Sequence, residues 1–226
     1  MTERKKIKKI KEKLDFSREY LLEEAVDFIK KNKAANFDES IEVHLNLAID
    51  LKKTEQMVKG SVTLPYSGFS QKKIAVFVEP EKEKEAKESG ADVVGGKNLI
   101  DEIKKSGKAD FDIAVATPGI MKELVILAKT LGPKGLMPSP KNGTITDDIK
   151  KTVAELKKGK ISFKNDEGGN IHQIVGKISW EDEKIVANLK SFLEAVRRSK
   201  PAKVKSGFIK NTVLCSSMGP GIKIKM

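Results

Sequence analysis

The stretch Ser40-Ile-Glu-Val-His-Leu-Asn-Leu-Ala-Ile-Asp-Leu51 decides how the two ends of this chain fold. Apolar residues occupy every second position in it, with mostly polar residues between them. A strict period of two predicts a β-strand with one buried and one open face, as in an antiparallel sheet. Glu42 and His44 belong to the open face. A second strand near residues 57–64 is expected to pair with the first across the polar turn at 52–55.

The segment before this strand predicts helices. Residues 1–13 are strongly basic, with apolar residues at spacings of three and four, which indicates a short amphipathic helix or a frayed arm. Ser17 is the expected N-cap of a second helix. The apolar stripe of that helix is expected to consist of Leu22, Ala25, Val26 and Ile29.

The middle of the chain has a different pattern. Three short runs are nearly continuous in apolar residues: Ile74-Ala-Val-Phe-Val78, Asp92-Val-Val94 and Asp112-Ile-Ala-Val-Ala116. Each is followed by a stretch with helical periodicity, at 81–89, 97–106 and 119–131. Strands that are buried on both faces and alternate with helices predict a parallel βαβ layer.

After residue 159 the pattern returns to short strands and one amphipathic helix at 181–199. Neither flank alone has enough strands to bury a core. The sequence therefore predicts a mixed α/β and α+β fold with two domains. Residues 1–66 plus 160–226 are expected to form a discontinuous antiparallel α+β domain, and residues 67–159 an inserted Rossmann-like βαβ domain.

The charge of the chain favours a polyanionic partner. The formal net charge is +12 over 226 residues, and the flanks carry 27 Lys and Arg against 18 Asp and Glu, a balance of +9. A protein this basic usually acts on nucleic acid, and the flanking domain is then the better candidate for the contact. The alternative is that Lys and Glu are simply abundant solubilising residues.

Other classes of protein receive little support. Cys215 is the only cysteine, which excludes an internal disulfide and fits a reducing compartment. With His44 and His172 as the only histidines, no standard structural zinc site or nucleophile–base pair is apparent, so we expect neither a metal nor catalysis. No apolar run approaches the ~20 residues of a membrane span, and the basic start lacks a secretion signal, so we expect a cytoplasmic protein.

Three glycine-containing segments are candidate ligand loops. Residues 90–97 resemble a phosphate loop but lack its spacing and its Ser or Thr, so no cofactor is expected. The loop 132–140 either caps its domain or presents backbone amides and Lys134 to RNA. The turn 217–221 is either an ordinary hairpin turn or a close approach to RNA, in which serine hydroxyls contact ribose or phosphate.

Several stretches together resemble the bacterial large-subunit ribosomal protein L1 family. They include Phe37-Asp-Glu-Ser-Ile-Glu-Val-His44, Met57-Val-Lys-Gly-Ser-Val-Thr-Leu-Pro65, Leu131-Gly-Pro-Lys-Gly-Leu-Met-Pro-Ser-Pro-Lys141 and Ser217-Met-Gly-Pro220. The resemblance implies a component of the large ribosomal subunit that binds the large-subunit rRNA of the mobile stalk. It also implies release of deacylated tRNA from the exit site and repression of translation through the protein's own operon mRNA.

The resemblance also implies a set of RNA-binding residues and a monomeric protein when free, without membrane contact. The residues are Asn36, Phe37, Ser40, Glu42, Lys164, Asn165, Asp166, Asn211, Ser217, Met218 and Gly219. Where Ser40 and Ser217 stand the family commonly has Thr, and where Asn36 and Asn211 stand it has Lys and Ser. Two other hypotheses stay open at this point: a nucleotide-using enzyme built on the middle domain, and a translational repressor with no place on the ribosome.

Overall fold

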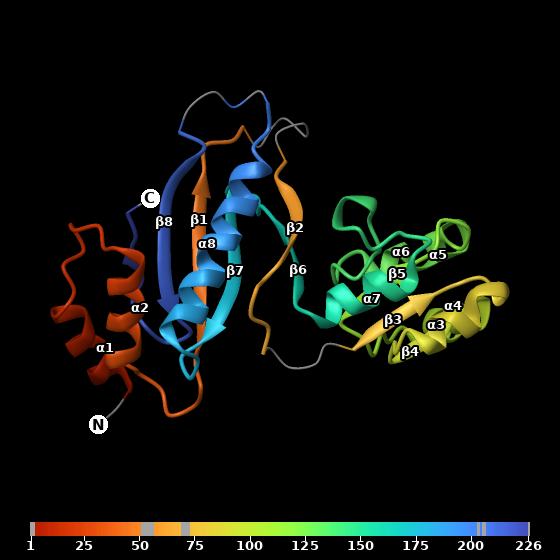
Figure 1. Ribbon diagram of the computed structural model, residues 1–226, viewed down its shortest axis with the longest axis horizontal. Helices are drawn as coiled ribbons and strands as arrows, with labels where there is room; N and C mark the ends of the chain where they lie inside the picture. The colour runs from red at the N-terminus through yellow and green to blue at the C-terminus, as the bar shows by residue number, and fades with distance from the viewer. Residues whose placement is uncertain (1–2, 51–56, 69–72, 203, 205–206, 226) are drawn as a thin grey trace. The chain divides into compact units, whose positions relative to one another are not determined.

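The computed structural model describes residues 3–50, 57–68, 73–202, 204 and 207–225. The chain divides into two compact units: Met1–Gly68 with Ile161–Met226, and Phe69–Lys160. Figure 1 shows both, with the first and last segments of the chain side by side in one unit. Among the described residues, no helix is long and apolar enough to cross a membrane.

The unit formed by both termini is built on antiparallel strands. Its elements are α1 (Glu3–Glu12), α2 (Leu22–Lys31), β1 (Ser40–Leu47), β2 (Lys59–Thr63), β6 (Lys160–Lys164), β7 (Asn170–Lys177), α8 (Asp182–Arg198), β8 (Ile209–Ser216) and β9 (Ile222–Lys223). One sheet has the strand order β7-β1-β8-β9, with each neighbouring pair antiparallel. A second sheet contains β2 and β6.

Strand β1 lies inside the larger sheet and shows the expected alternation. Ile41, Val43, Leu45 and Leu47 are all buried, whereas the residues between them are half-buried. Helices α2 and α8 cover the buried side of the sheet (Figure 1). The open face therefore carries Glu42 and His44, as the alternation of the sequence predicts.

Two expectations about this unit are wrong. β1 ends at Leu47 rather than at residue 51, and β2 pairs with β6 rather than with β1. Both edges of β1 are already occupied by β7 and β8, so no backbone groups remain on it for β2. A polar turn between two strands does not by itself fix the pairing partner, and the proposed turn at 52–55 lies outside the described residues.

The second helix begins later than its N-cap prediction. Ser17 directs its amide and hydroxyl to Asp15, and the N-cap of α2 is Leu21. The backbone of Tyr20 is bound to that of Lys223, which draws the preceding residues onto β9 and delays the helix. Ala25, Val26 and Ile29 then form its buried stripe, as expected, whereas Leu22 is only half-buried.

The unit 69–160 is built on a parallel sheet with the order β4-β3-β5. Its elements are β3 (Ile74–Phe77), η2 (Pro80–Lys82), α3 (Glu83–Glu88), β4 (Val93–Gly95), α4 (Lys97–Ser106), β5 (Ile113–Ala116), α5 (Met121–Leu124), η3 (Val125–Leu127), α6 (Ala128–Leu131), η4 (Pro140–Asn142) and α7 (Ile149–Lys157). All residues of β3 are buried, with separate apolar clusters on the two faces of the sheet. This confirms the parallel, doubly covered layer that the continuous apolar runs predict.

The long helix expected at 119–131 is broken into α5, η3 and α6. The loop after it is partly structural, because Leu136 and Met137 pack against the apolar cluster around Phe77 and Leu131. Lys134 remains exposed near the tip of this loop. The loop therefore caps its own unit and leaves a cation open to solvent.

Candidate nucleic-acid interface

The predicted RNA-binding residues gather at two places on the larger sheet, and the first is organised by Glu39. This carboxylate is fully buried. Its Oε1 accepts hydrogen bonds from the amides of Ala34 (3.1 Å) and Ala35 (2.8 Å), and its Oε2 accepts one from the amide of Met218 (3.2 Å). Glu39 thereby joins the segment before β1 to the turn after β8.

Burial raises the pKa of Glu39, but the hydrogen bonds outweigh it. Donors from the backbone of Ala35, Met218 and Ala34 and from the side chain of Ser216 hold the pKa below its ordinary value. A carboxylate that accepts several hydrogen bonds is stabilised in its charged form. Glu39 is therefore a buried anion that fixes the surrounding loops rather than a group offered to a ligand.

Ser40 and Ser217 lie together above this carboxylate. The amide of Ser40 donates to Ser217 Oγ (3.1 Å), and the amide of Ser217 donates to the carbonyl oxygen of Ser40 (3.0 Å). A Cβ added to Gly219 would lie 2.5 Å from Ser216 Oγ, so the turn has no room for a side chain there. The Ser217 hydroxyl also donates to the carbonyl oxygen of Ser40 (3.4 Å), and the residue is exposed.

Large apolar side chains are exposed in the two segments that Glu39 joins. Phe37 is 55% exposed and Met218 38% exposed, and Asn36 next to Phe37 is exposed as well. We call Asn36, Phe37, Ser40, Ser217, Met218 and Gly219 the serine–phenylalanine patch. It contains an aromatic ring, a thioether and a hydroxyl, next to a turn that the buried Glu39 carboxylate fixes. An unstacked base can stack on such a ring, and a ribose can bond to such a hydroxyl.

The second place is the turn from β6 to β7, where two of the predicted residues bond within the protein. Asn165 is buried, with its Oδ1 accepting from the Val58 amide (2.8 Å) and its Nδ2 donating to the Asp166 carbonyl (2.8 Å). Asp166 Oδ1 accepts from the amides of Gly168 (2.8 Å) and Asn170 (2.6 Å). Both side chains close the turn, whereas Lys164 is exposed beside them.

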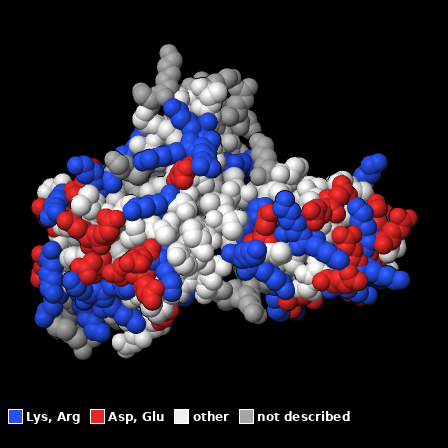
Figure 2. All heavy atoms as spheres, in the orientation of Figure 1, with Lys and Arg blue, Asp and Glu red and all other residues white. Residues whose placement is uncertain are grey.

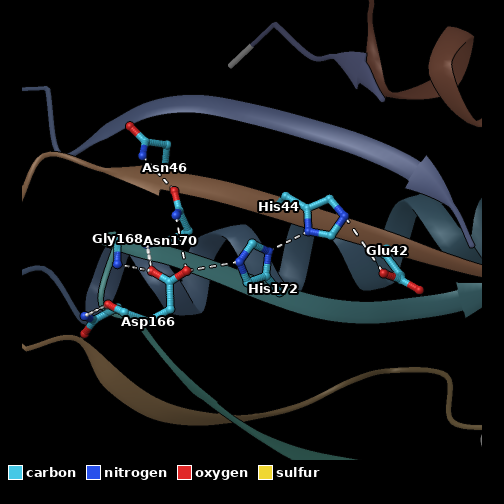
Figure 3. A network of polar contacts seen from close by, with 8 residues as sticks. Glu42, His44, Asn46, Asp166, Gly168, Asn170 and His172 are labelled. Atoms are coloured by element: carbon cyan, nitrogen blue, oxygen red, sulfur yellow. Dashed lines mark hydrogen bonds and ion pairs between the residues drawn. The ribbon is translucent and has the colours of Figure 1, made fainter. Parts of the chain in front are cut away.

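A row of polar side chains crosses the open face of the sheet between the two places (Figure 3). His44 and His172 are register partners on β1 and β7, and their Nδ1 atoms are 2.7 Å apart. His172 Nε2 lies 3.4 Å from Asp166 Oδ2, and His44 Nε2 lies 3.1 Å from Cys215 Sγ. The four side chains therefore form one continuous chain of contacts.

The donors and acceptors along this row of four side chains can be assigned from Asp166 outward. Hydrogen bonds from the Asn170 backbone, most of all, hold the pKa of Asp166 below its ordinary value, so Asp166 is an ionised acceptor. His172 then donates to Asp166 through Nε2 and accepts from His44 through Nδ1, which leaves His44 Nε2 as an acceptor facing the thiol. Burial lowers the pKa of His44, followed by the effect of His172, although Glu42 opposes this.

Glu42 and Asn211 are the remaining predicted residues. Glu42 is half-buried, pairs in register with Cys215, and brings Oε2 to 3.9 Å from His44 Nε2. Burial and this carboxylate raise the pKa of Cys215 to about 11. Asn211 is exposed on β8, where it pairs in register with Asn46, so it lies with the second group rather than with the serine–phenylalanine patch.

Positive charge is greater on this unit than on the other. Residues 1–68 and 161–226 contain 26 Lys and Arg against 18 Asp and Glu, whereas residues 69–160 contain 18 against 14. Figure 2 shows blue side chains gathered at the C-terminal end of α8, whose last turn carries Arg197 and Arg198, and a closer mixture of blue and red on the other unit. The imbalance favours the unit built from both termini as the polyanion-binding part.

Residue patterns alone do not reveal Glu39, Asn170 or the pairing of the two histidines. Glu39 could have been noticed as a carboxylate next to a predicted strand, but its partners lie in the turn after β8 as well as near it. The two histidines are far apart in sequence, and their register is fixed only when β1 and β7 pair.

Comparison with known proteins gives a single result. Residues 29–220 match the model of the "Ribosomal protein L1p/L10e family". The proteins named large ribosomal subunit protein uL1 from Fervidobacterium nodosum and Thermosipho melanesiensis are each 44% identical, over 98% and 97% of this chain and 94% and 95% of their own lengths. The protein of that name from Solibacter usitatus is 46% identical over 92% of this chain and 88% of its own length.

Proposed function

Because this chain belongs to the ribosomal protein L1p/L10e family, we propose that it is a structural constituent of the large ribosomal subunit and binds large-subunit rRNA. The unit formed by residues 1–68 and 161–226 is the RNA-binding part. The serine–phenylalanine patch is the main contact, and the rRNA of the mobile stalk is its target.

The observation that carries this proposal is the exposure of Phe37 and Met218 in the two segments that Glu39 joins, where the Ser217 hydroxyl is also fixed. A base can stack on the ring, while the hydroxyl bonds a ribose 2′-OH or a phosphate. The buried Glu39 holds these groups in place before binding, which reduces the conformational entropy lost in the complex.

The other predicted residues take distinct roles. Lys164, Asn36 and Asn211 are exposed and reach RNA directly, whereas Asn165 and Asp166 shape the turn that presents Lys164. Glu42 lies on the open face between the two groups and accepts from ribose hydroxyls or base amino groups.

The proposal extends to the cell. The protein acts in the cytoplasm on the ribosome as a single copy, helps deacylated tRNA leave the exit site, and represses its own operon mRNA through an RNA site like that in rRNA. The inserted Rossmann-like unit, residues 67–159 by the sequence pattern, folds as a separate domain. Co-sedimentation with large subunits separates this proposal from a repressor that never enters the ribosome.

The experiment that tests the RNA contact replaces Phe37 by Ala. Its side chain is exposed, so the substitution leaves the free energy of unfolding within about 0.5 kcal/mol of wild type. Loss of a stacked base weakens binding to a stalk rRNA fragment by about 1–3 kcal/mol, measured by fluorescence anisotropy. S217A is expected to weaken binding as well, by roughly 0.5–1.5 kcal/mol for one neutral hydrogen bond.

Ile126→Ala is the matched control. Ile126 is 57% exposed and belongs to the unit 69–160, which is not the proposed RNA-binding part, so a similar loss of exposed apolar surface leaves RNA affinity unchanged. Equal affinities for wild type, F37A and S217A would refute the patch as the RNA contact. Equal losses for F37A and I126A would instead indicate a nonspecific effect of exposed apolar side chains.

A further inference from the structure

Three potential metal ligands from two neighbouring strands meet on the open face of the sheet. Glu42 and His44 are alternate residues of β1, and Cys215 stands opposite Glu42 on β8. One ligand atom from each side chain can be chosen so that all lie within 4.8 Å of one another. The group contains a carboxylate, an imidazole and a thiol, each of which is half-buried.

Two of the three separations between the ligand atoms are close to those around a common ion. His44 Nε2 is 3.1 Å from Cys215 Sγ and 3.9 Å from Glu42 Oε2. Tetrahedral bonds of the usual zinc lengths require separations of about 3.6 Å and about 3.4 Å between these pairs of atoms. Each of these two distances differs from the required one by about half an ångström. The atoms of the third pair, from Cys215 and Glu42, lie within 4.8 Å of one another.

Contacts with His172 and, through it, with Asp166 already orient the His44 imidazole for this role. His44 uses Nδ1 toward His172, and His172 uses Nε2 toward Asp166, so the lone pair of His44 Nε2 points to the thiol. Metal-binding histidines commonly donate their other ring N–H to such a partner, which fixes the tautomer and raises ligand basicity. Here the carboxylate acts through one further histidine (Figure 3).

We propose that Glu42, His44 and Cys215 form a binding site for a divalent transition-metal ion of the zinc class. A thiolate and an imidazole favour such an ion over Mg²⁺ or Ca²⁺, which take oxygen ligands. The half-buried side chains leave a fourth position to water. The sequence does not predict this site, because its histidines and single cysteine match no standard zinc motif. The three ligands come together only when β1 pairs with β8.

Binding exchanges one proton for the metal. The thiol loses its proton to solvent, its sulfur forms a bond to the ion, and the ion displaces the hydrogen bond between Cys215 and His44. No oxidant or reductant takes part. The ion also balances the charge of Glu42 and of the thiolate that forms on binding.

Cobalt(II) titration of the full-length protein without RNA tests the site, because a thiolate bound to Co²⁺ gives a charge-transfer absorption band. Wild type is expected to bind a single Co²⁺ with this band, and Zn²⁺ is expected to displace it. C215S, which removes the only thiol, abolishes the band. H172A keeps the band but weakens affinity by about 10–100-fold, because His172 is a positioning residue.

The matched control moves the thiol along the same face. The double variant C215S/N211C keeps one cysteine on β8, about 13 Å from the original position at ~3.3 Å per residue. It is expected to lose the band, although its thiol is exposed. Circular dichroism confirms that each variant is folded.

Wild-type protein that gives no thiolate band, or a relocated thiol that binds Co²⁺ as tightly as Cys215, would overturn the proposal. Undiminished affinity in H172A would exclude the positioning role of His172. Because RNA is absent from the titration, these outcomes do not depend on the proposed ribosomal function.

Discussion

At the scale of single residues, Glu39 is the side chain on which the proposed RNA contact depends most. Replacing it by Gln retains the size but removes the charge, and one amide N–H₂ then faces the backbone N–H groups that the carboxylate accepts. Leaving buried donors unpaired costs about 1–3 kcal/mol. Urea unfolding of E39Q is expected to show this loss, and E42Q, at a half-buried carboxylate on the open face, serves as the comparison.

The pH dependence of that difference has a definite sign. The pKa of Glu39 is lowered on folding, so its contribution to stability is present above its unfolded pKa of about 4.5. The contribution is lost as pH falls through the lower folded pKa. The difference in unfolding free energy between wild type and E39Q is therefore expected to be constant near neutral pH and to shrink in acid. A difference that grows in acid would contradict the assignment.

The sequence predicts the exposed residues of the proposed RNA contact better than the residues that hold them in place. The resemblance places Phe37 and Ser217 in the RNA contact, and the structure has both exposed, in the two segments that Glu39 joins. It also places Asn165 and Asp166 there, and their side chains are engaged within the protein. A motif marks which residues matter, but it does not distinguish a side chain that touches RNA from one that shapes the turn beside it.

At the scale of elements, the packing of α8 on the strands sustains the unit built from both termini. Phe192 of α8 is fully buried and meets Phe163 of β6 edge to face, with 5.5 Å between ring centroids. F192A is expected to reduce the unfolding free energy by about 3–5 kcal/mol through lost burial and a cavity. Trp180, the only tryptophan, lies in the same unit, so its fluorescence follows this transition.

Phe16→Ala gives the comparison for that experiment, since its exposed ring contributes little to the core. A loss of similar size in F16A and F192A would mean that α8 is not held as described.

The sequence predicted α8 and the alternation of β1 because hydrophobic periodicity is local. It misplaced β2 because pairing depends on which strand edges remain open, and that is settled only in the assembled sheet.

At the scale of the whole molecule, β1 lies between β7 and β8, so the first unit requires both ends of the chain. Residues 1–68 alone are expected to stay unfolded. Residues 69–160 alone, with apolar clusters on both faces of their sheet, are expected to unfold cooperatively on heating. A chain that joins residues 1–68 to 161–226 by a short Gly-Ser linker is expected to fold and to bind RNA, as circular dichroism and anisotropy can check.

A folded 1–68 fragment, or a joined chain that does not fold, would contradict this division of the molecule.

Family membership confirms the resemblance found in the sequence and the expectation that the chain is not an enzyme. The mixed α and β fold is also confirmed, whereas the RNA, mRNA and tRNA partners remain predictions. The composition of the chain can indicate that its partner is a polyanion. The protein surface that would select one RNA depends on the conformation of turns such as 217–221, which composition does not give.

The most direct test is an RNA titration with the full-length protein across a salt series, using a stalk fragment of large-subunit rRNA and a scrambled RNA of equal length. Shape-specific recognition through the serine–phenylalanine patch predicts tight binding to the stalk fragment that persists at moderate salt, with much weaker binding to the scrambled RNA. Equal binding to both RNAs that falls steeply with salt would contradict the account, because a basic surface alone would then explain the affinity.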